Sequence, residues 1–400
     1  MALGCVAGPA GLTTWPTPGG LTTRVRGRDI NRGIIRPADM DLLIVTDRWD
    51  DAGGGREAYL AELRSSLVRR GHSVGVITRT GRSERLLQRD IDTFRRMHPT
   101  GPVMAARPAA GATHYQLHSG VYADAYEAER ASYESSLRRW WFRSALRVNR
   151  RRRSLLQIEA ETMAVGSGTM LMAFSNQSHD ALRRVYGVSD ERITLTRPGV
   201  DLTVFRPHTE NVSGGRPMAQ RGHSPVQLLF AGHNFVLKGL RWAMAAVAVA
   251  RRAGIDAHLT VAGRGPIPAF ASLARRLNIA PHVRFAGCIA RGALADLYRE
   301  SDLLIHPTFY DPFPRVIVEA LASGVPVVTT RACGGAEILA HGRDGFIVDD
   351  PRQVEALAEA IAAVADPDRR AALGAEAART GQRFDFESHA EAVATWLAGR

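Results

Sequence analysis

The most constraining feature of this sequence is a repeated alternation of short apolar runs with longer stretches of helical periodicity. In the first half, the runs Leu42–Val45 and Val74–Ile77 flank a stretch with Leu60, Leu63 and Leu67 at helical spacing. Runs this short and apolar are typical of strands buried on both faces of a parallel sheet. The pattern therefore predicts an α/β fold class with doubly wound sheets.

The same alternation continues to residue 205 and returns in the second half. A strand is expected at each of His114–His118, Ala173–Phe174 and Arg192–Leu195, with helix over 122–165. In the second half the expected strands are Gln227–Ala231, His258–Ala262, Val283–Ala286, Leu303–His306, Val327–Thr329 and Phe346–Val348. Four hundred residues also suit two domains better than one core.

The composition along the chain predicts where the domains divide. Residues 1–39 are rich in Gly, Pro, Thr and Arg and predict a disordered leader, which leaves both Met1 and Met40 open as the start of translation. The expected parts are a domain over 41–205, a polar linker over 206–225, a domain over 226–385, and a helix over 386–400 that crosses back to the first domain.

The charge of the chain favours an anionic partner. The formal net charge is +12, and Lys238 is the only lysine in the sequence. Where arginine fills every other cationic position, one lysine indicates a site that needs a compact, mobile ammonium, although chance is a rival explanation. Three scattered cysteines predict neither a disulfide framework nor a metal cage, and no apolar run reaches the ~18 residues of a membrane span, so a cytoplasmic protein is expected.

The most specific segment is Ser301–Val328, where a strand is followed by a loop and then a helix. Pro312 and Pro314 exclude helix before about residue 314, so Asp311 lies in the loop and Glu319 in the second helical turn. The free N–H groups of a helix N-terminus favour a phosphate, and carboxylates beside it can accept hydrogen bonds from sugar hydroxyls. The alternative is an ordinary loop Asp and surface Glu.

This segment resembles the family 4 retaining glycosyltransferases of the GT-B fold. Their signature is two acidic residues separated by seven others, then a helix and a small-Gly-x-Pro turn, which here are Asp311, Glu319 and Ser323–Pro326. The resemblance implies that Asp311 contacts the donor sugar and Glu319 holds the nucleotide ribose. The sequence departs from the family by having Asp at the first acid and Pro314 where the family often has Gly.

Further motifs of this family occur in order along residues 41–400. They are Gly54-Gly55-Arg56-Glu57, Arg70–Val74, Gly232–Gly239 with Lys238, and Cys333-Gly334-Gly335 with Glu337. In the family an Arg and a Lys of the third motif neutralise the donor diphosphate; here His233 stands in place of the Arg, as lipopolysaccharide-core transferases also lack it. Arg264 or Arg315 is expected to supply the missing charge.

The resemblance implies two GT-B domains of Rossmann-like form that face each other across a cleft, the first binding the acceptor and the second the nucleotide sugar. His118, Asp311 and Lys238 are expected to be catalytic; His114, His72 and His233 are rivals of His118. The expected donor-binding residues are Gly54, Gly55, Gly232, His233, Lys238, Arg264, Asp311, Phe313, Arg315, Val316 and Glu319. No metal or cofactor is expected.

The implied activity is retaining transfer of a hexose from a nucleoside-diphosphate sugar, UDP-sugar favoured, to a glycan or lipid-linked acceptor. The resemblance to lipopolysaccharide-core glucosyltransferases implies a role in cell-envelope polysaccharide or lipopolysaccharide biosynthesis. The alternatives are a nucleotide-sugar epimerase of the same fold and a non-catalytic binder of polyanions or nucleic acid. Nucleic acid is not expected as a partner.

The stretch Arg138–Arg153 carries eight arginines, no acidic residue, and the aromatic residues Trp140, Trp141 and Phe142. Basic segments with aromatic residues at one end are typical of helices on anionic membrane surfaces. Binding of a phosphorylated glycan and a merely solvated helix face are the alternatives. The first interpretation predicts a peripheral position on the inner face of the cytoplasmic membrane.

Overall fold

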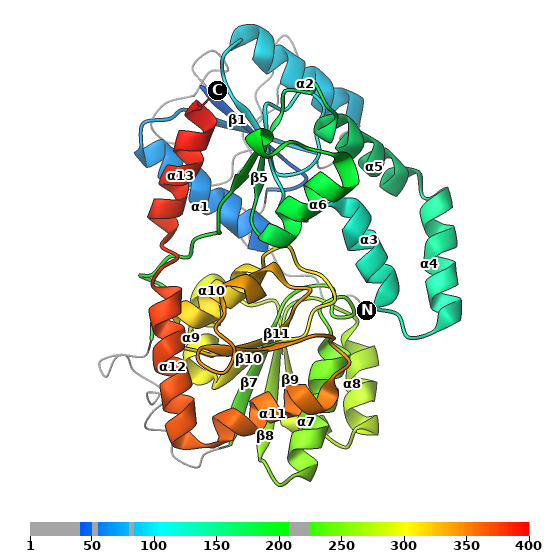
Figure 1. The fold of residues 1–400 in the computed structure, drawn as a ribbon, viewed down its shortest axis with the longest axis vertical. Coiled ribbons are helices and arrows are strands. Elements are labelled where there is room, and N and C mark those ends of the chain that lie inside the picture. Colours follow the sequence, from blue (N-terminus) through cyan, green and yellow to red (C-terminus); the bar gives the residue numbers. More distant parts are fainter. Residues whose placement is uncertain (1–40, 50–54, 80–83, 208–224, 400) are drawn as a thin grey trace, which may run out of the picture.

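The computed structural model describes residues 41–49, 55–79, 84–207 and 225–399 (Figure 1). The expected leader over 1–39, the alternative start at Met40, Gly54 and most of the linker over 206–225 lie outside these residues.

The N-terminal domain is built on a parallel six-stranded sheet in the order β2-β1-β3-β4-β5-β6. Its strands are β1 Leu42–Thr46, β2 Val74–Thr78, β3 Val103–Ala105, β4 His114–Gln116, β5 Met170–Ala173 and β6 Ile193–Leu195. Its helices are α1 Gly55–Arg69, α2 Glu84–Met97, α3 Tyr122–Ala131, α4 Ser136–Val148, α5 Arg150–Met163 and α6 Asn176–Tyr186.

The C-terminal domain repeats this plan with a second parallel sheet, in the order β12-β11-β10-β7-β8-β9. Its strands are β7 Val226–Ala231, β8 Ala257–Ala262, β9 Val283–Gly287, β10 Leu303–His306, β11 Val327–Thr330 and β12 Gly345–Val348. Its helices are α7 Leu240–Arg252, α8 Ile267–Arg276, α9 Arg291–Glu300, α10 Arg315–Ala322, α11 Val354–Ala365 and α12 Pro367–Gly381, followed by α13 Phe386–Ala398.

The predicted α/β fold class is confirmed, and the predicted strands are present with ends within two residues, except that β5 covers Met170–Ala173 where Ala173–Phe174 was expected. The three-residue strand β3 was not predicted, because its run Val103–Ala105 is too short to show a pattern. The helical stretch expected over 122–165 is present as three helices, separated at Ser132–Ser135 and at Asn149. Ser135 and Asn149 each accept a hydrogen bond from the backbone N–H three residues on, as helix N-caps do.

The described residues form three hydrophobic clusters, and one of them extends through both domains. It contains side chains of α1, α10, α12 and α13, including Leu63, Ile317, Ala377 and Val393, all of which are fully buried. The other two clusters each cover the remaining face of one sheet. Each sheet is thus buried on both faces, which explains why its strands are continuously apolar.

The C-terminal helix returns to the first domain after α12 (Figure 1). Where the chain crosses, Val200 N donates to Phe384 O at 2.8 Å, and Phe386 N donates to Val200 O at 3.0 Å. A Cβ on Gly199 would lie 2.6 Å from Asp385 O, so only glycine fits beside the returning segment. Helix α13 then packs on α1, with Ser66 Oγ donating to Glu387 Oε2 at 2.7 Å.

Charged side chains join the two domains where the carboxyl ends of their sheets face each other. Glu62 of α1 accepts hydrogen bonds from Arg291 and Arg315 of the C-terminal domain, both at 2.8 Å. In the other direction, Glu337 accepts the backbone N–H groups of Asn176 and Gln177 at the start of α6, at 2.9 and 3.0 Å. The domains therefore dock through paired charges as well as through the shared apolar cluster.

We expect Glu62→Gln to lower the free energy of unfolding by about 1 to 3 kcal/mol, because the largely buried Arg315 and the partly exposed Arg291 lose their shared anionic acceptor. Urea unfolding at neutral pH measures this. The matched control is Glu359→Gln, since Glu359 is exposed on α11 and should change stability by less than about 0.5 kcal/mol. Equal stabilities of the two variants would contradict the importance of the Glu62 contacts.

Candidate functional site

The residues expected to bind a donor lie in loops at the carboxyl ends of the second sheet. Gly232 directly follows β7, and Lys238 lies in the turn that leads into α7. His306 is the last residue of β10, and Asp311 lies in the loop that leads from it to α10. Because the strands are parallel, their carboxyl ends share one edge of the sheet, the usual place for ligands in such folds.

Lys238, Asp311 and His306 form a charged cluster at this edge. Lys238 Nζ lies 2.5 Å from Asp311 Oδ2 and also donates to Tyr310 O at 3.1 Å. His306 Nε2 is 3.6 Å from the same Asp311 oxygen. Burial acts to raise the pKa of Asp311, but the Lys238 charge and the contacts with His306 together outweigh it, so the pKa lies below the usual value and the carboxylate is ionised. Burial lowers the pKa of His306, whose imidazole is therefore neutral.

Two glycines allow these loops to approach closely. Gly239 has φ +75°, and a Cβ there would lie 1.9 Å from Pro307 O. Gly263, after β8, has φ +131°, and its Cβ would lie 1.9 Å from Gly232 O. The positive φ and the close contact exclude other residues at both positions. Gly239 of the predicted motif, and Gly263 outside it, therefore hold the Lys238 turn against the ends of β10 and β8.

His233, which stands where the family has Arg, lies next to Arg264. Its Nδ1 accepts the backbone N–H of Arg264 at 3.0 Å, and both side chains are exposed. Partial burial and the Arg264 charge lower the pKa of His233, whereas Glu57 of the first domain acts to raise it. His233 is therefore a neutral, exposed side chain near the facing domain, and the Arg264 guanidinium is available at the surface.

The second acid of the signature, Glu319, is buried in α10, which begins at Arg315 as predicted. Its Oε2 accepts the hydroxyl of Tyr298 at 3.1 Å, and Arg315 Nε lies 3.9 Å from Oε1. Burial raises the pKa of Glu319 despite the nearby Arg315. Arg315 itself is bound to Glu62, so the structure places it between the domains rather than free beside Lys238.

His118 lies just after β4 in the first domain and is partly exposed. Its ring makes edge contacts with Tyr59 and Phe174, with centroid distances of 4.8 and 5.0 Å. Burial, followed by the charges of Arg56, His389 and Arg315, holds its pKa well below the usual range. The imidazole is therefore neutral at physiological pH.

The remaining predicted residues lie around this interface. Phe313 is buried under the guanidinium of Arg197, and Val316 O accepts the Tyr298 hydroxyl at 3.3 Å. Gly55 is the exposed first residue of α1. Of the rivals to His118, His114 is buried against Trp396 and His72 lies beside Asp41, at the amino end of β1. Neither reaches the facing edges of the sheets.

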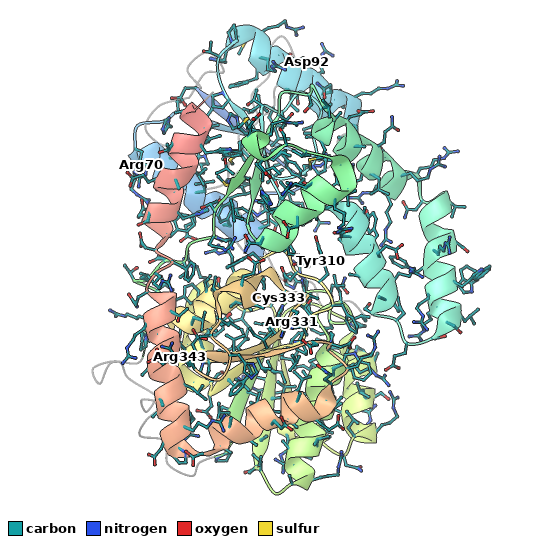
Figure 2. The ribbon with its side chains drawn as sticks, in the orientation of Figure 1. Arg70, Asp92, Tyr310, Arg331, Cys333 and Arg343 are labelled. Carbon is teal, nitrogen blue, oxygen red and sulfur yellow. The ribbon has the colours of Figure 1, made fainter. Side chains whose placement is uncertain are left out.

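Two features of this interface were missed in the sequence. Tyr310, labelled with Cys333 in Figure 2, packs so tightly on Gly120 of the first domain that a Cβ there would lie 2.0 Å from its hydroxyl. In the sequence, Glu62, the partner of Arg315, is indistinguishable from an ordinary acidic residue on the surface of a helix. The only available signal for Tyr310 was its place beside Asp311, and nothing in the sequence distinguished Glu62.

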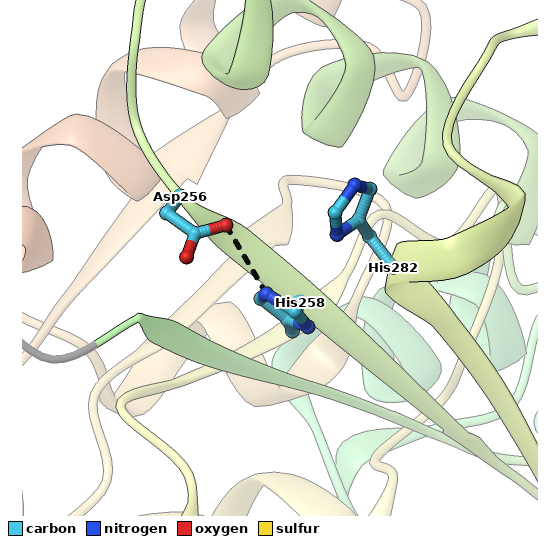
Figure 3. A group of neighbouring side chains, drawn as sticks. All are labelled: Asp256, His258 and His282. Atoms are coloured by element: carbon cyan, nitrogen blue, oxygen red, sulfur yellow. Dashed lines mark hydrogen bonds and ion pairs between the residues drawn. The ribbon is translucent and has the colours of Figure 1, made fainter.

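One group of described residues has the chemistry of metal ligands: Asp256, His258 and His282 (Figure 3). His258 and His282 lie at the amino ends of β8 and β9, at the opposite end of the sheet from Lys238. Asp256 is exposed, and its Oδ1 is bound by Arg251 at 2.6 Å as well as by His258 Nε2 at 3.1 Å. The Asp256 carboxylate is thus already paired with the Arg251 guanidinium. A cavity of about 350 Å³ near Asp41 and Leu397 is likewise remote from the site.

We expect Asp311→Asn to lower the free energy of unfolding at pH 7 by about 2 to 4 kcal/mol, because it leaves the Lys238 ammonium without its counter-ion in a mostly shielded place. The folded-state pKa of Asp311 is depressed, so its stabilisation is complete above the ordinary value of 3.8 and is lost as the pH falls below it. Urea unfolding should therefore show wild type and variant converging in acid. A gap independent of pH would contradict this, and the exposed Asp296→Asn is the control.

Comparison with known proteins finds a related family and related folds. Residues 225–366 match the family model described as "Glycosyl transferases group 1". A D-inositol 3-phosphate glycosyltransferase from Rhodococcus opacus is 32% identical over 244 residues, which are 58% of this chain and 54% of the relative. One from Thermobispora bispora is 33% identical over 252 residues, 60% of this chain and 58% of the relative. The chain thus spans somewhat more than half the length of these relatives.

Solved structures resemble both domains together. WaaG, a glycosyltransferase involved in lipopolysaccharide biosynthesis, superimposes with a TM-score of 0.73 at 22% identity, covering 90% of this chain and 100% of WaaG. Anabaena Alr3699/HepE, solved with UDP and glucose, gives a TM-score of 0.64 at 18% identity, covering 90% of this chain and all of HepE. The chain therefore has the GT-B fold of two Rossmann-like domains, and its second domain matches the group 1 glycosyl transferases.

Proposed function

We propose that the protein is a retaining glycosyltransferase that moves a hexose from a nucleoside-diphosphate sugar to a glycan or lipid-linked acceptor. The observation that carries the proposal is the cluster of Lys238 and Asp311 at the strand ends, with Glu319 in the second turn of the helix that follows. An ammonium beside carboxylates suits a ligand that combines a diphosphate with sugar hydroxyls. The group 1 match over 225–366 supports the same function for this domain.

In this proposal the donor diphosphate replaces Asp311 as the ion-pair partner of Lys238. The ammonium is held by one carboxylate oxygen and one carbonyl, so its third hydrogen is free for a phosphate oxygen. Once Lys238 turns to the diphosphate, Asp311 can accept hydroxyls of the donor sugar, and Glu319 those of the ribose. UDP is the favoured nucleotide because HepE, which shares the fold, was solved with UDP and with UDP-glucose.

The reaction breaks the bond between the anomeric carbon and the diphosphate oxygen. Positive charge develops on the sugar ring while the departing diphosphate gains negative charge, which Lys238 and the exposed Arg264 are placed to stabilise. The acceptor hydroxyl bonds to the anomeric carbon on the face the diphosphate leaves, and its proton passes to the leaving diphosphate. Neutral His118 faces the sugar from the first domain as a hydrogen-bond partner.

We expect UDP or a UDP-sugar at 100 times its dissociation constant to stabilise the protein by about 2.7 kcal/mol, seen as a higher melting temperature. Lys238→Ala and Glu319→Ala should each abolish the shift, whereas the control Glu359→Ala, on the outer helix α11, should retain it. GDP, ADP and their hexose conjugates identify the base. The absence of any shift with folded protein would contradict a donor site and leave polyanion binding as the alternative.

The proposed lipid-linked acceptor is inferred from helix α4, which projects from the N-terminal domain (Figure 1). Leu137, Trp140, Trp141 and Val148 of this helix are all 60% or more exposed. Arg138, Arg139 and Arg143 on α4 are exposed as well. Large apolar side chains among arginines match an anionic membrane surface, where aromatic rings enter the interface and cations meet lipid phosphates.

This surface supports a peripheral position on the inner face of the cytoplasmic membrane and a lipid-linked acceptor of the cell envelope, such as a lipopolysaccharide precursor. Among the described residues no helix is both long and apolar enough to cross a bilayer. The second candidate acceptor is an inositol phosphate, since the curated relatives are D-inositol 3-phosphate glycosyltransferases. Transfer of labelled hexose to each acceptor class separates the two.

We expect vesicles that contain phosphatidylglycerol, but not vesicles of phosphatidylcholine alone, to bind the protein. Replacing Arg138, Arg139 and Arg143 by Gln should weaken binding roughly 100-fold, since each arginine near the surface contributes about 1 kcal/mol. The matched control replaces the exposed Arg85, Arg89 and Arg96 of α2 by Gln. Equal vesicle sedimentation of both triple variants would contradict a specific role of α4.

A further inference from the structure

A continuous chain of hydrogen bonds connects His118 with the C-terminal helix. His118 Nε2 lies 3.2 Å from Gln116 Oε1, and Gln116 Nε2 lies 3.1 Å from the Tyr59 hydroxyl. That hydroxyl is 2.8 Å from Nε2 of His389, which is on α13. Gln116, Tyr59 and His389 are buried, with at most 5% of each exposed, whereas His118 is partly exposed.

The orientation of the Gln116 amide follows from a fifth residue. Met172 Sδ lies 3.4 Å from Gln116 Nε2. A thioether sulfur carries no hydrogen and can only accept, so the amide atom that faces it has to be the NH₂ group. The same NH₂ group then donates its other hydrogen to Tyr59. The Gln116 oxygen consequently points at His118.

The orientation of the Gln116 amide determines which ring nitrogen carries the hydrogen in each of the two histidines. A carbonyl oxygen can only accept, so His118 Nε2 carries the hydrogen and its Nδ1 holds the lone pair. Tyr59 accepts from Gln116, and its single hydrogen goes to His389 Nε2, which is therefore the unprotonated nitrogen. The hydrogens that link these residues, on His118 Nε2, the Gln116 amide and the Tyr59 hydroxyl, thus each meet an acceptor.

We propose that His389 is a positioning residue that sets the tautomer of His118 through Tyr59 and Gln116. The proposal rests on the proposed function in one respect: it is the Nδ1 lone pair of His118 that would accept a hydroxyl of the donor sugar. The tautomer itself is a property of the free protein. Helix α13 therefore does more than fasten the domains together, because its histidine selects which nitrogen of His118 can act.

The proposal predicts what happens when the acceptor at His389 is removed. Tyr59 then has a buried hydrogen that has lost its acceptor, and the Gln116 oxygen can replace that acceptor if the amide turns over. The turn gives up only the weak contact of the NH₂ group with Met172 Sδ. A flip of the amide satisfies Tyr59 and brings the NH₂ group to His118. His118 Nε2 must then accept, so its hydrogen moves to Nδ1, and the lone pair that the sugar needs is lost.

Burial and nearby arginines keep both histidines neutral. Burial lowers the pKa of His389 to about 4, and the Arg315 charge adds to this, whereas the backbone of Arg197 acts in the opposite direction. Arg56 and Arg315 act on His118 in the same sense as its burial. The relevant change in the pH range 6 to 8 is therefore the place of a hydrogen, and not a change of charge.

The test is the ¹⁵N NMR spectrum of histidine-labelled full-length protein at pH 7, with the His118 signals assigned by their loss in His118→Gln. Protonated and unprotonated ring nitrogens resonate apart, so the tautomer is read directly. We expect wild type to show Nε2–H, His389→Leu to show Nδ1–H, and His389→Gln, whose amide oxygen can accept from Tyr59, to restore Nε2–H.

The double variant Tyr59→Phe/His389→Leu separates this mechanism from a loosened helix. It removes the orphaned hydroxyl as well as its acceptor, so His118 should return to Nε2–H although α13 still lacks its histidine. Nδ1–H in wild type would overturn the proposal, even if His389→Leu failed to fold. So would retention of Nε2–H in a folded His389→Leu variant, or failure of the double variant to restore it.

Transfer activity provides the second readout. In His389→Leu we expect kcat/KM to fall by about tenfold or more, the effect of losing one hydrogen bond to the sugar, and to recover in the double variant. UDP affinity should be unchanged in all variants, because the nucleotide lies in the other domain. Full activity of a His389→Leu variant with shifted His118 tautomer would overturn the functional half, whereas absence of donor binding in wild type would refute the proposed function and leave the NMR result standing.

Discussion

The structure depends on the meeting of two parallel sheets by their carboxyl ends. Each such edge gathers the loops of six strands, and those loops carry polar side chains because the strands themselves are buried. Bringing two of these edges together buries charged side chains, and this costs free energy unless each charge is paired with an opposite one. Here Glu62 binds two arginines across the interface and Glu337 caps α6, so the charges that the folds expose there are matched.

The fold was predictable because strands that are buried on both faces of a sheet have short, almost entirely apolar sequences. Runs such as Leu42–Val45 and Leu303–Ile305 are apolar throughout and are all buried. The exceptions have local physical causes. Strand β3 is too short to show a period, and the helix over 122–165 breaks at Asn149, where an N-cap hydrogen bond competes with helix continuation.

The candidate site was predictable in part. Residues that stand in local sequence motifs were predicted, whereas contacts between residues far apart in the sequence, outside any motif, were not. Lys238 and Asp311 are 73 residues apart, but each stands in a recognisable motif, and the structure brings them to 2.5 Å. Arg315 was expected to face the donor, whereas its partner is Glu62, 253 residues away on an unremarkable helix. Likewise no local pattern marks His389, since its contact with Tyr59 arises only after α13 has crossed to the first domain.

The central claim is that this interface holds a nucleotide sugar. A crystal structure of the full chain with UDP-glucose tests it most directly, because it locates every part of the ligand at once. The account predicts the diphosphate against Lys238, the ribose against Glu319, and the hexose between Asp311 and His118, with Lys238 released from Asp311. A nucleotide bound elsewhere, or a hexose that contacts neither Asp311 nor His118, would contradict it.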